Sequence, residues 1–270
     1  MGQGNIIGPP NDSTTSIAKG IWDLNEQRIA KAANTWPLGT RVEYLTSVSS
    51  TTDATSYTFN NISLGETGPS RRIFFHVPTD WIPNPSGNLN FSSTWTTSAG
   101  TYTNSLVVSD GGLGEAGQNY PILSDFSVYI GRWFSMISSI IPTATTGNLS
   151  FTVTTNGVLS AGVAPSIFAL YNLDVATPTV VENGIGSQVL TNFTPGSIAI
   201  VFQTVYDAEA VPTITGSPLA LTFLNNNTRT VQTATMKSVI YLVQNNTSST
   251  VTETITSTSS TVNLRYYRFR

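Results

Sequence analysis

Residues that could do acid–base or nucleophilic chemistry are few in this 270-residue chain. His76 is the only histidine, and histidine is the usual proton shuttle at neutral pH. It lies in the run RRIFFHV (71–77), whose alternation places it with Arg72 and Phe74 on one face of a strand. We expect that face to be the outer one. Because no Gly-x-Ser-x-Gly turn accompanies it, we favour a surface histidine over a catalytic one.

The carboxylates do not cluster along the chain either. Asp207 and Glu209 are two residues apart after an apolar segment, and Asp174 and Glu182 lie in loop-like sequence. A Ca²⁺ site or a glycosidase pair would need several such groups to converge. With no cysteine and one histidine, a tight zinc site is excluded. The Gly-rich stretch 110–117 lacks the lysine of a phosphate loop. We therefore predict no enzyme activity, no metal and no cofactor.

Aromatic side chains offer one further kind of site, a platform on which sugar rings stack. Trp81, Trp95 and Tyr102 are the candidates, and Trp81 lies in a Pro-containing, loop-like segment. A β domain of this size also needs aromatic residues in its core. We favour core or interface packing and keep contact with a glycan as the alternative.

Composition narrows the classes of partner. Charged residues make up 10% of the chain, against roughly 25% in typical soluble domains. The formal net charge of −3 gives no basic footprint for nucleic acid. No apolar run approaches the length of a membrane span, so we expect no membrane insertion. The first ten residues lack the basic start and the apolar run of a secretory signal.

From residue 41 onward the sequence alternates between apolar and polar residues and is interrupted by Gly, Pro and Asn. The pattern predicts strands at 41–46, 57–64, 71–77, 89–95, 102–109, 125–130, 149–155, 166–173, 197–206, 219–224, 236–243, 251–256 and 262–269. One weak helical pattern covers 133–140. The C-terminal segment alternates basic and aromatic residues, and we favour a last strand over a contact to an acidic neighbour. Short, regularly spaced strands indicate an all-β, antiparallel β-sandwich that is jelly-roll-like.

The first 37 residues differ from the rest. Residues 1–18 carry no periodicity and predict an extended arm. Capping residues and good helix formers then predict a short helix at 23–34, ending before Pro37. Its apolar stripe is too narrow to be stable alone, so it must dock on another surface. The docking residues that we expect are Trp22, Leu24, Ile29 and Trp36. The predicted domains are an arm with helix, 1–37, and a β-sandwich, 38–270.

The same N-terminal segment resembles one in structural proteins of tailed bacteriophages, especially marine and cyanobacterial ones. The matching residues are Gly20-x-Trp22-x-Leu24-x-x-Gln27, then Trp36-Pro37. Further similarity covers the Tyr-Thr-Phe strand with its Leu-Gly end at 56–65, the Ser-Arg-Arg-Ile segment at 70–73, which resembles the family's Ser-x-Arg-x-Ile, and the strand start at 196–200. The resemblance is concentrated in the first 75 residues.

The resemblance implies a non-enzymatic virion component: a tail fibre, a tail-tip or baseplate protein, or a capsid decoration protein. We therefore expect the protein in the virion, assembled in the host cytoplasm, as a homo-oligomer with a trimer as the first choice. Other virion proteins would be its partners. The alternative is an adhesin module that binds a host-surface glycan.

Overall fold

The computed structural model divides the chain into two compact units, Met1–Gly39 and Thr40–Arg270. The residues that it describes all belong to the second unit. They are 40–82, 90–109, 119–120, 129–154, 159–173, 178–185, 187–206, 210–231, 234–259 and 263–270. The expected arm and docking helix lie outside these residues and stay predictions.

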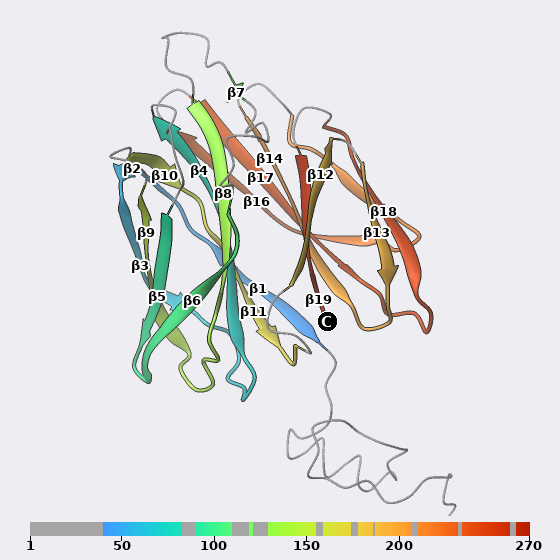
Figure 1. Ribbon diagram of the computed structural model, residues 1–270, viewed down its shortest axis with the longest axis horizontal. Helices are drawn as coiled ribbons and strands as arrows, with labels where there is room; N and C mark the ends of the chain where they lie inside the picture. The colour runs from blue at the N-terminus through green and yellow to red at the C-terminus, as the bar shows by residue number, and fades with distance from the viewer. Residues whose placement is uncertain are drawn as a thin grey trace, which may run out of the picture. The chain divides into compact units, whose positions relative to one another are not determined.

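The described residues form three antiparallel sheets and no helix (Figure 1). The eleven-stranded sheet contains β1 (Arg41–Ser47), β2 (Ser50–Ala54), β3 (Ser56–Ser63), β4 (Arg72–Ile82), β5 (Asn90–Thr97), β6 (Gly100–Ser109), β7 (Asn119–Tyr120), β8 (Tyr129–Ser138), β9 (Thr146–Thr154), β10 (Leu159–Val163) and β11 (Ser166–Tyr171). The five-stranded sheet contains β12 (Thr179–Ile185), β14 (Ile198–Tyr206), β16 (Leu221–Val231), β17 (Ala234–Gln244) and β19 (Asn263–Phe269). The three-stranded sheet contains β13 (Ser187–Phe193), β15 (Ile214–Ser217) and β18 (Val251–Ser257). The predicted all-β, antiparallel sandwich is confirmed.

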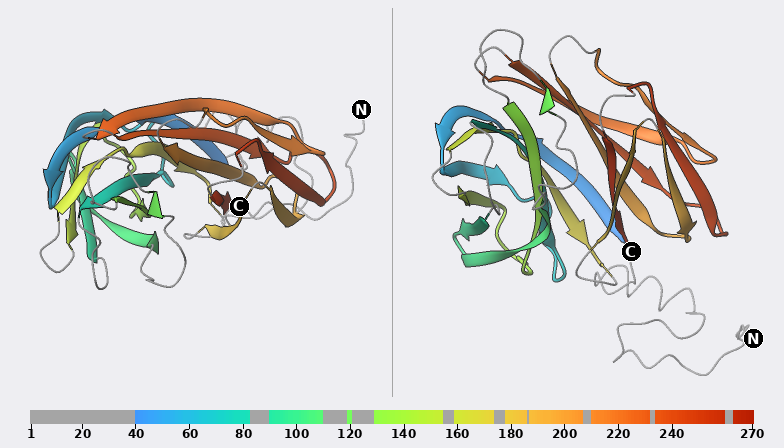
Figure 2. Two further views of the ribbon diagram at one scale, coloured as in Figure 1. Left: turned by 90° about the horizontal axis from the view of Figure 1, so that it is seen from above. Right: turned by 45° about the horizontal axis from the view of Figure 1, so that its top comes forward.

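The eleven-stranded sheet runs β1-β11-β4-β8-β6-β5-β9-β3 and curls into a half-barrel (Figure 2). Apolar side chains that point into the curl form what we call the inner cluster. It consists of Tyr57, Ile62, Leu64, Ile73, Phe75, Val77, Trp95, Phe134, Met136, Ile141, Ala144, Leu149, Phe151, Val153, Val163, Ile167, Ala169 and Tyr171. Strand β4 contributes alternate residues, as its pattern predicts. The curl lets one sheet cover much of its own core.

A second group of side chains lies between the half-barrel and the five-stranded sheet. This middle cluster consists of Phe74, Ile137, Phe168, Leu170, Ile200, Phe202, Ile240, Tyr267 and Phe269. Its aromatic rings meet edge-on or tilted, as Phe74 does with Phe269 at 5.4 Å between centroids. Strand β4 is therefore buried on both faces, because Phe74 points out of the curl while Phe75 points into it.

The five-stranded sheet is covered on its other side by the three-stranded sheet. The outer cluster between them consists of Leu190, Phe193, Ala199, Val201, Ile214, Val239, Val243, Ile255, Leu264 and Tyr266. The continuous apolar run at 198–202 forms a strand that is buried on both faces, because Ile200 and Phe202 join the middle cluster and Ala199 and Val201 the outer one.

The weak helical pattern at 133–140 is wrong: strand β8 continues to Ser138. Residues Phe134 to Ser138 are all buried, with Phe134 and Met136 in the inner cluster and Ile137 in the middle one. A strand buried on both faces loses the two-residue alternation that distinguishes it from a buried helix.

Candidate functional site

His76 is buried, with 1% of its surface exposed, which corrects the expectation of a surface histidine. Its Nδ1 lies 2.8 Å from Ser135 Oγ and 3.0 Å from the Tyr267 hydroxyl. Its ring stacks on Phe202 with centroids 4.2 Å apart. The assignment of His76 to the face of Phe74 is correct. That face, however, is covered by the five-stranded sheet rather than by water.

These polar groups connect two sheets inside the middle cluster. Ser135 Oγ donates a hydrogen bond to the Tyr267 hydroxyl at 2.6 Å, and Ser135 is fully buried. A serine beside a histidine could form part of a nucleophilic site. A substrate could reach Ser135 only if the two sheets separated. The arrangement therefore favours a structural role, in which each polar group satisfies another within an aromatic interface.

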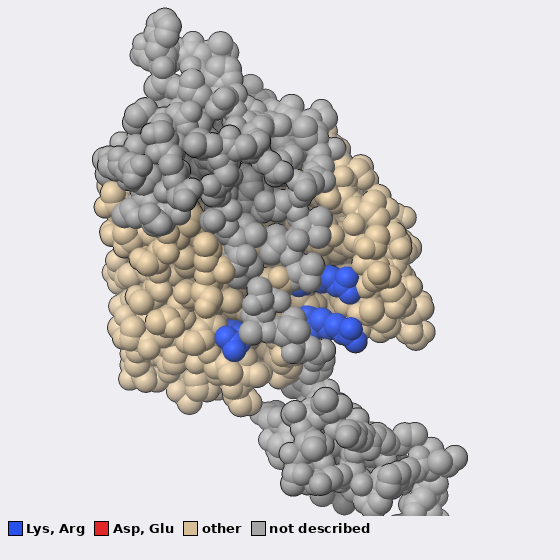
Figure 3. Space-filling view, in the orientation of Figure 1, with Lys and Arg blue, Asp and Glu red and all other residues tan. Residues whose placement is uncertain are grey.

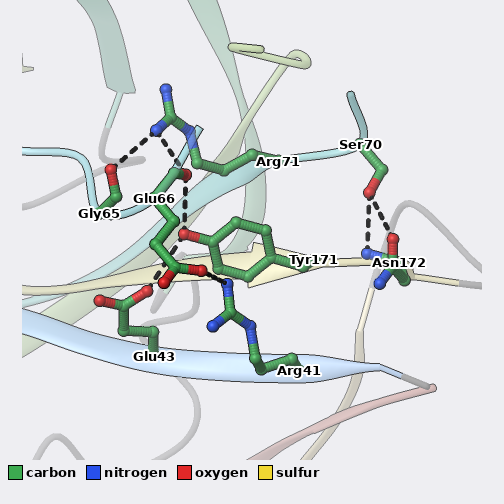
Figure 4. Close-up of polar contacts among 8 residues, drawn as sticks. All are labelled: Arg41, Glu43, Gly65, Glu66, Ser70, Arg71, Tyr171 and Asn172. Atoms are coloured by element: carbon green, nitrogen blue, oxygen red, sulfur yellow. Dashed lines mark hydrogen bonds and ion pairs between the residues drawn. The ribbon is translucent and has the colours of Figure 1, made fainter. Parts of the chain in front are cut away.

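A dense polar network lies where the described unit begins (Figure 4). At its centre Arg71, which is fully buried, donates hydrogen bonds to four backbone carbonyls. They belong to Ile141 at 2.9 Å, Gly65 at 3.1 Å, Glu66 at 2.8 Å and Ala144. Burial lowers the pKa of Arg71, and charged donors compensate by forming strong hydrogen bonds. One side chain thus closes the 65–71 loop onto the segment after β8.

Tyr171 extends the network to the first strand. Its hydroxyl lies 2.9 Å from the Glu66 carbonyl oxygen and 3.1 Å from Glu43 Oε2. Burial, and then the Glu43 carboxylate, raise the pKa of Tyr171 to about 12, so the hydroxyl keeps its proton at neutral pH. A Cβ on Gly65, which has φ +71°, would lie 2.9 Å from that hydroxyl. Glycine is required there for both backbone and space.

The first residues of β1 are held by the same group. Arg41 lies over the ring of Tyr171, 4.0 Å from its centroid, and pairs with Glu66 at 2.8 Å. Thr40 Oγ1 donates to the carbonyl of Asn172 at 3.2 Å. The Arg41–Glu66 pair is exposed and contributes little by itself. Together with the contacts of Arg41 with Tyr171 and of Thr40 with Asn172, the pair nevertheless holds the first residues of β1 in place.

A further contact joins β1 to the five-stranded sheet. The Tyr44 hydroxyl donates to Ser47 Oγ at 2.9 Å, and Asn225 Nδ2 of β16 donates to that hydroxyl at 2.5 Å. Among the described strands, β1 stands at the end of its sheet and pairs with β11 alone. A central strand is held by backbone hydrogen bonds to two neighbours, whereas β1 has one such neighbour in the described part of the chain. Side-chain hydrogen bonds therefore provide additional contacts that hold β1 in place.

Sequence reasoning did not find this network. The residues Gly65 and Arg71 lie in the segment that carries the resemblance, but nothing in the sequence joins them to Tyr171, a hundred positions later. The one local signal was a glycine followed by consecutive arginines at a strand start.

The four residues expected to dock the N-terminal helix belong to the first unit. Trp22, Leu24, Ile29 and Trp36 lie outside the described residues, so their docking role stays a prediction.

The fold brings two of the three aromatic candidates for glycan contact together, because Trp95 of β5 and Tyr102 of β6 are cross-strand partners. Trp81 belongs to β4 rather than to a loop, and its backbone pairs with Ile130. Trp95 has no exposed surface and lies in the inner cluster, so its ring cannot stack on a sugar. Tyr102 is half-buried and packs against the same cluster. The favoured interpretation, core packing, therefore holds for Trp95, and the glycan alternative does not apply to that residue.

Charged groups are sparse on the described surface. On the face that Figure 3 shows, Lys and Arg side chains gather in the lower part of the view, and no described Asp or Glu is visible. Within the described ranges, no three His, Cys, Asp or Glu residues come together as metal ligands would. In the same ranges, no helix has the length and apolar character needed to cross a membrane. Asp207 and Glu209 lie outside the described residues.

Comparisons with protein-family models, with curated proteins and with solved structures found no match to this chain.

Proposed function

We propose that this chain is a non-enzymatic structural protein of a bacteriophage particle, as a tail fibre, tail-tip or baseplate protein, or head-decoration protein. The N-terminal segment attaches it to neighbouring virion proteins, and the β domain faces outward. The protein acts as a homo-oligomer, with a trimer as the expected state.

The observation that carries the proposal is that side-chain contacts, in addition to backbone pairing, hold β1 to the rest of the β domain. A domain attached through its N-terminus receives any pull at its first strand, and an edge strand with one neighbour would peel away first. Here β1 is held to β11 by its ladder and by the hydrogen bond that Glu43 accepts from Tyr171. It is held to the 65–71 loop through Arg41 and to β16 through Tyr44. This reinforcement suits a junction between an attachment segment and a displayed domain.

The second support is the resemblance of the segment around Trp22 and Trp36 to the attachment-type segment of tailed-phage structural proteins. That segment joins the described domain at β1. The described buried residues of all three clusters belong to the second unit, Thr40–Arg270.

Deletion of residues 1–37 tests the proposal. The truncated chain should fold, with a cooperative thermal transition close to that of the full chain, but should be missing from particles purified from infected cells. A full-length chain with Trp22→Ala and Trp36→Ala serves as the matched variant and should also fail to incorporate. Normal incorporation of the truncated, folded chain into particles would refute the proposal. Analytical ultracentrifugation of the full chain checks the trimer.

A further inference from the structure

Four neighbouring strands of the half-barrel turn one chemically uniform face outward. The order β3-β9-β5-β6 places these strands side by side, and their registers align the outward residues in rows. The rows are Thr58–Ser150–Thr94–Thr103, Ser56–Thr152–Ser92 and Asn148–Thr96–Thr101. We call these residues the hydroxyl face. The residues that alternate with them, such as Tyr57, Leu149 and Trp95, point into the inner cluster.

Every side chain of the hydroxyl face ends in a hydroxyl or an amide. All of them are exposed or half-buried. Figure 3 shows only uncharged described residues over β3, β9 and β5, which lie on the left in Figure 1. Designed and natural surfaces usually carry about 25–35% charged residues. A face of this size without charge is therefore a distinct chemical surface.

The groups on this face are held in defined positions. Ser56 Oγ lies 3.2 Å from Thr152 Oγ1, and Thr58 Oγ1 lies 3.1 Å from Ser150 Oγ. Threonine side chains are also stiff at χ1 because they are β-branched. A ligand would therefore meet an ordered array of donors and acceptors, with little side-chain entropy left to lose.

The chemistry of the face decides between occupants. Without charged groups it offers nothing specific to an anion, a cation or an acidic peptide. A second copy of the chain is disfavoured, because protein interfaces are built around a core of aromatic and apolar residues and are depleted in serine. A neutral, hydroxyl-rich polymer fits, since hydroxyls both donate and accept hydrogen bonds and no ion has to be desolvated.

We propose that the hydroxyl face binds a neutral polysaccharide chain that lies across the four strands. Neighbouring strands are spaced at roughly 4.8 Å, which is close to the length of one pyranose ring, so a linear glycan along a row would present about one sugar to each strand. The surface differs from the aromatic platform that the sequence suggested. The inference is also independent of a role in the phage particle.

The test is binding of the full chain to neutral glycans, with cellohexaose and dextran as probes and heparin as the charged comparison. Isothermal titration and ligand-observed NMR should detect weak binding to at least one neutral glycan and none to heparin. The variant Thr58→Val, Thr94→Val, Thr103→Val keeps the β-branched shape but removes three of the four hydroxyls in one row. It should bind about tenfold more weakly or worse, because each hydrogen bond is worth roughly a two- to tenfold change in affinity.

A matched triple variant on the other sheets, Thr222→Val, Thr252→Val and Thr256→Val, controls for the general effect of the substitution. It should bind as the unmodified chain does, and both variants should melt within a few degrees of it. Three results would overturn the proposal: no binding of the full chain to either neutral glycan, equal weakening by both variants, or loss of self-association in the face variant with glycan binding unchanged.

Discussion

Arg71 is the residue whose replacement tests the network at the start of the β domain most directly. Arg71→Met keeps an unbranched apolar stem in place and removes every donor of the guanidinium. The carbonyls of Ile141 and Ala144 then lose their partner within a buried region, while those of Gly65 and Glu66 lie nearer to solvent and can take water. We expect the variant to be strongly destabilised.

The magnitude follows from the two buried acceptors. A buried polar group left without a partner costs about 1–3 kcal/mol, so two of them cost about 2–6 kcal/mol. Part of this is offset, because methionine does not require a charge to be desolvated, and burial is what lowers the pKa of Arg71. We therefore expect a loss of about 3 kcal/mol, or about 6–12 °C in melting temperature for a domain of this size.

Urea unfolding of the full chain, followed by tryptophan fluorescence, measures this loss. The matched control is Arg72→Met, the same substitution one position along. Arg72 is half-buried, and its Nη1 donates a hydrogen bond to the carbonyl of Ser138 at 2.8 Å. Because this contact involves one acceptor rather than four, Arg72→Met should cost clearly less than Arg71→Met. Equal, small losses for the two variants would refute the role of Arg71 as the hub of the network.

Two further predictions concern the turn beside β18. A Cβ on Gly216 would overlap Leu221 Cδ1 and Glu253 Oε1 and lie 2.6 Å from the Leu219 carbonyl oxygen. Gly216→Ala should therefore cost about 1–3 kcal/mol in urea unfolding, while Gly68→Ala, whose Cβ would meet ordinary contacts at 3.5 Å or more, should cost far less. Burial raises the pKa of Glu253 from 4.5, opposed by its backbone hydrogen bonds, so the folded state binds this proton more tightly than the unfolded state. Its stabilising contribution is complete below pH 4.5 and is lost as pH rises through the folded value. Glu253→Gln should remove that loss, so the gain in melting temperature of the variant over the unmodified chain should be larger at pH 7 than at pH 5. The same gain at both pH values would contradict the prediction.

The sequence predicted the strands best where alternation was intact or where the apolar run was continuous and β-branched. The two faces of 71–77 were assigned correctly, and the strand predicted at 197–206 is present as β14, with 198–202 buried on both faces. The error at 133–140 has a physical cause, since a strand between two cores has no polar face to give it a period. Its aromatic and Met residues are as typical of a buried helix.

His76 and Trp95 show what alternation cannot supply. The pattern identifies which residues share a face, but it does not say whether another sheet covers that face. His76 was assigned to the correct side of β4, and a second sheet then buried it. Contacts such as that of Arg71 with Ala144 depend on how the half-barrel closes, and local sequence carries no record of this closure.

The low charge content has a consistent structural use in the described residues. Arg71 organises four carbonyls, Arg268 donates to the carbonyls of Thr191 and Asn192, and buried Glu253 accepts the N–H of Leu219. These charged groups hold backbone rather than each other. Hydrogen bonds from a charged side chain to a fixed carbonyl are short-ranged and are screened less by salt than exposed ion pairs. A domain stabilised in this way can leave its outer faces to neutral hydroxyls, and β3, β9, β5 and β6 turn such a face to solvent.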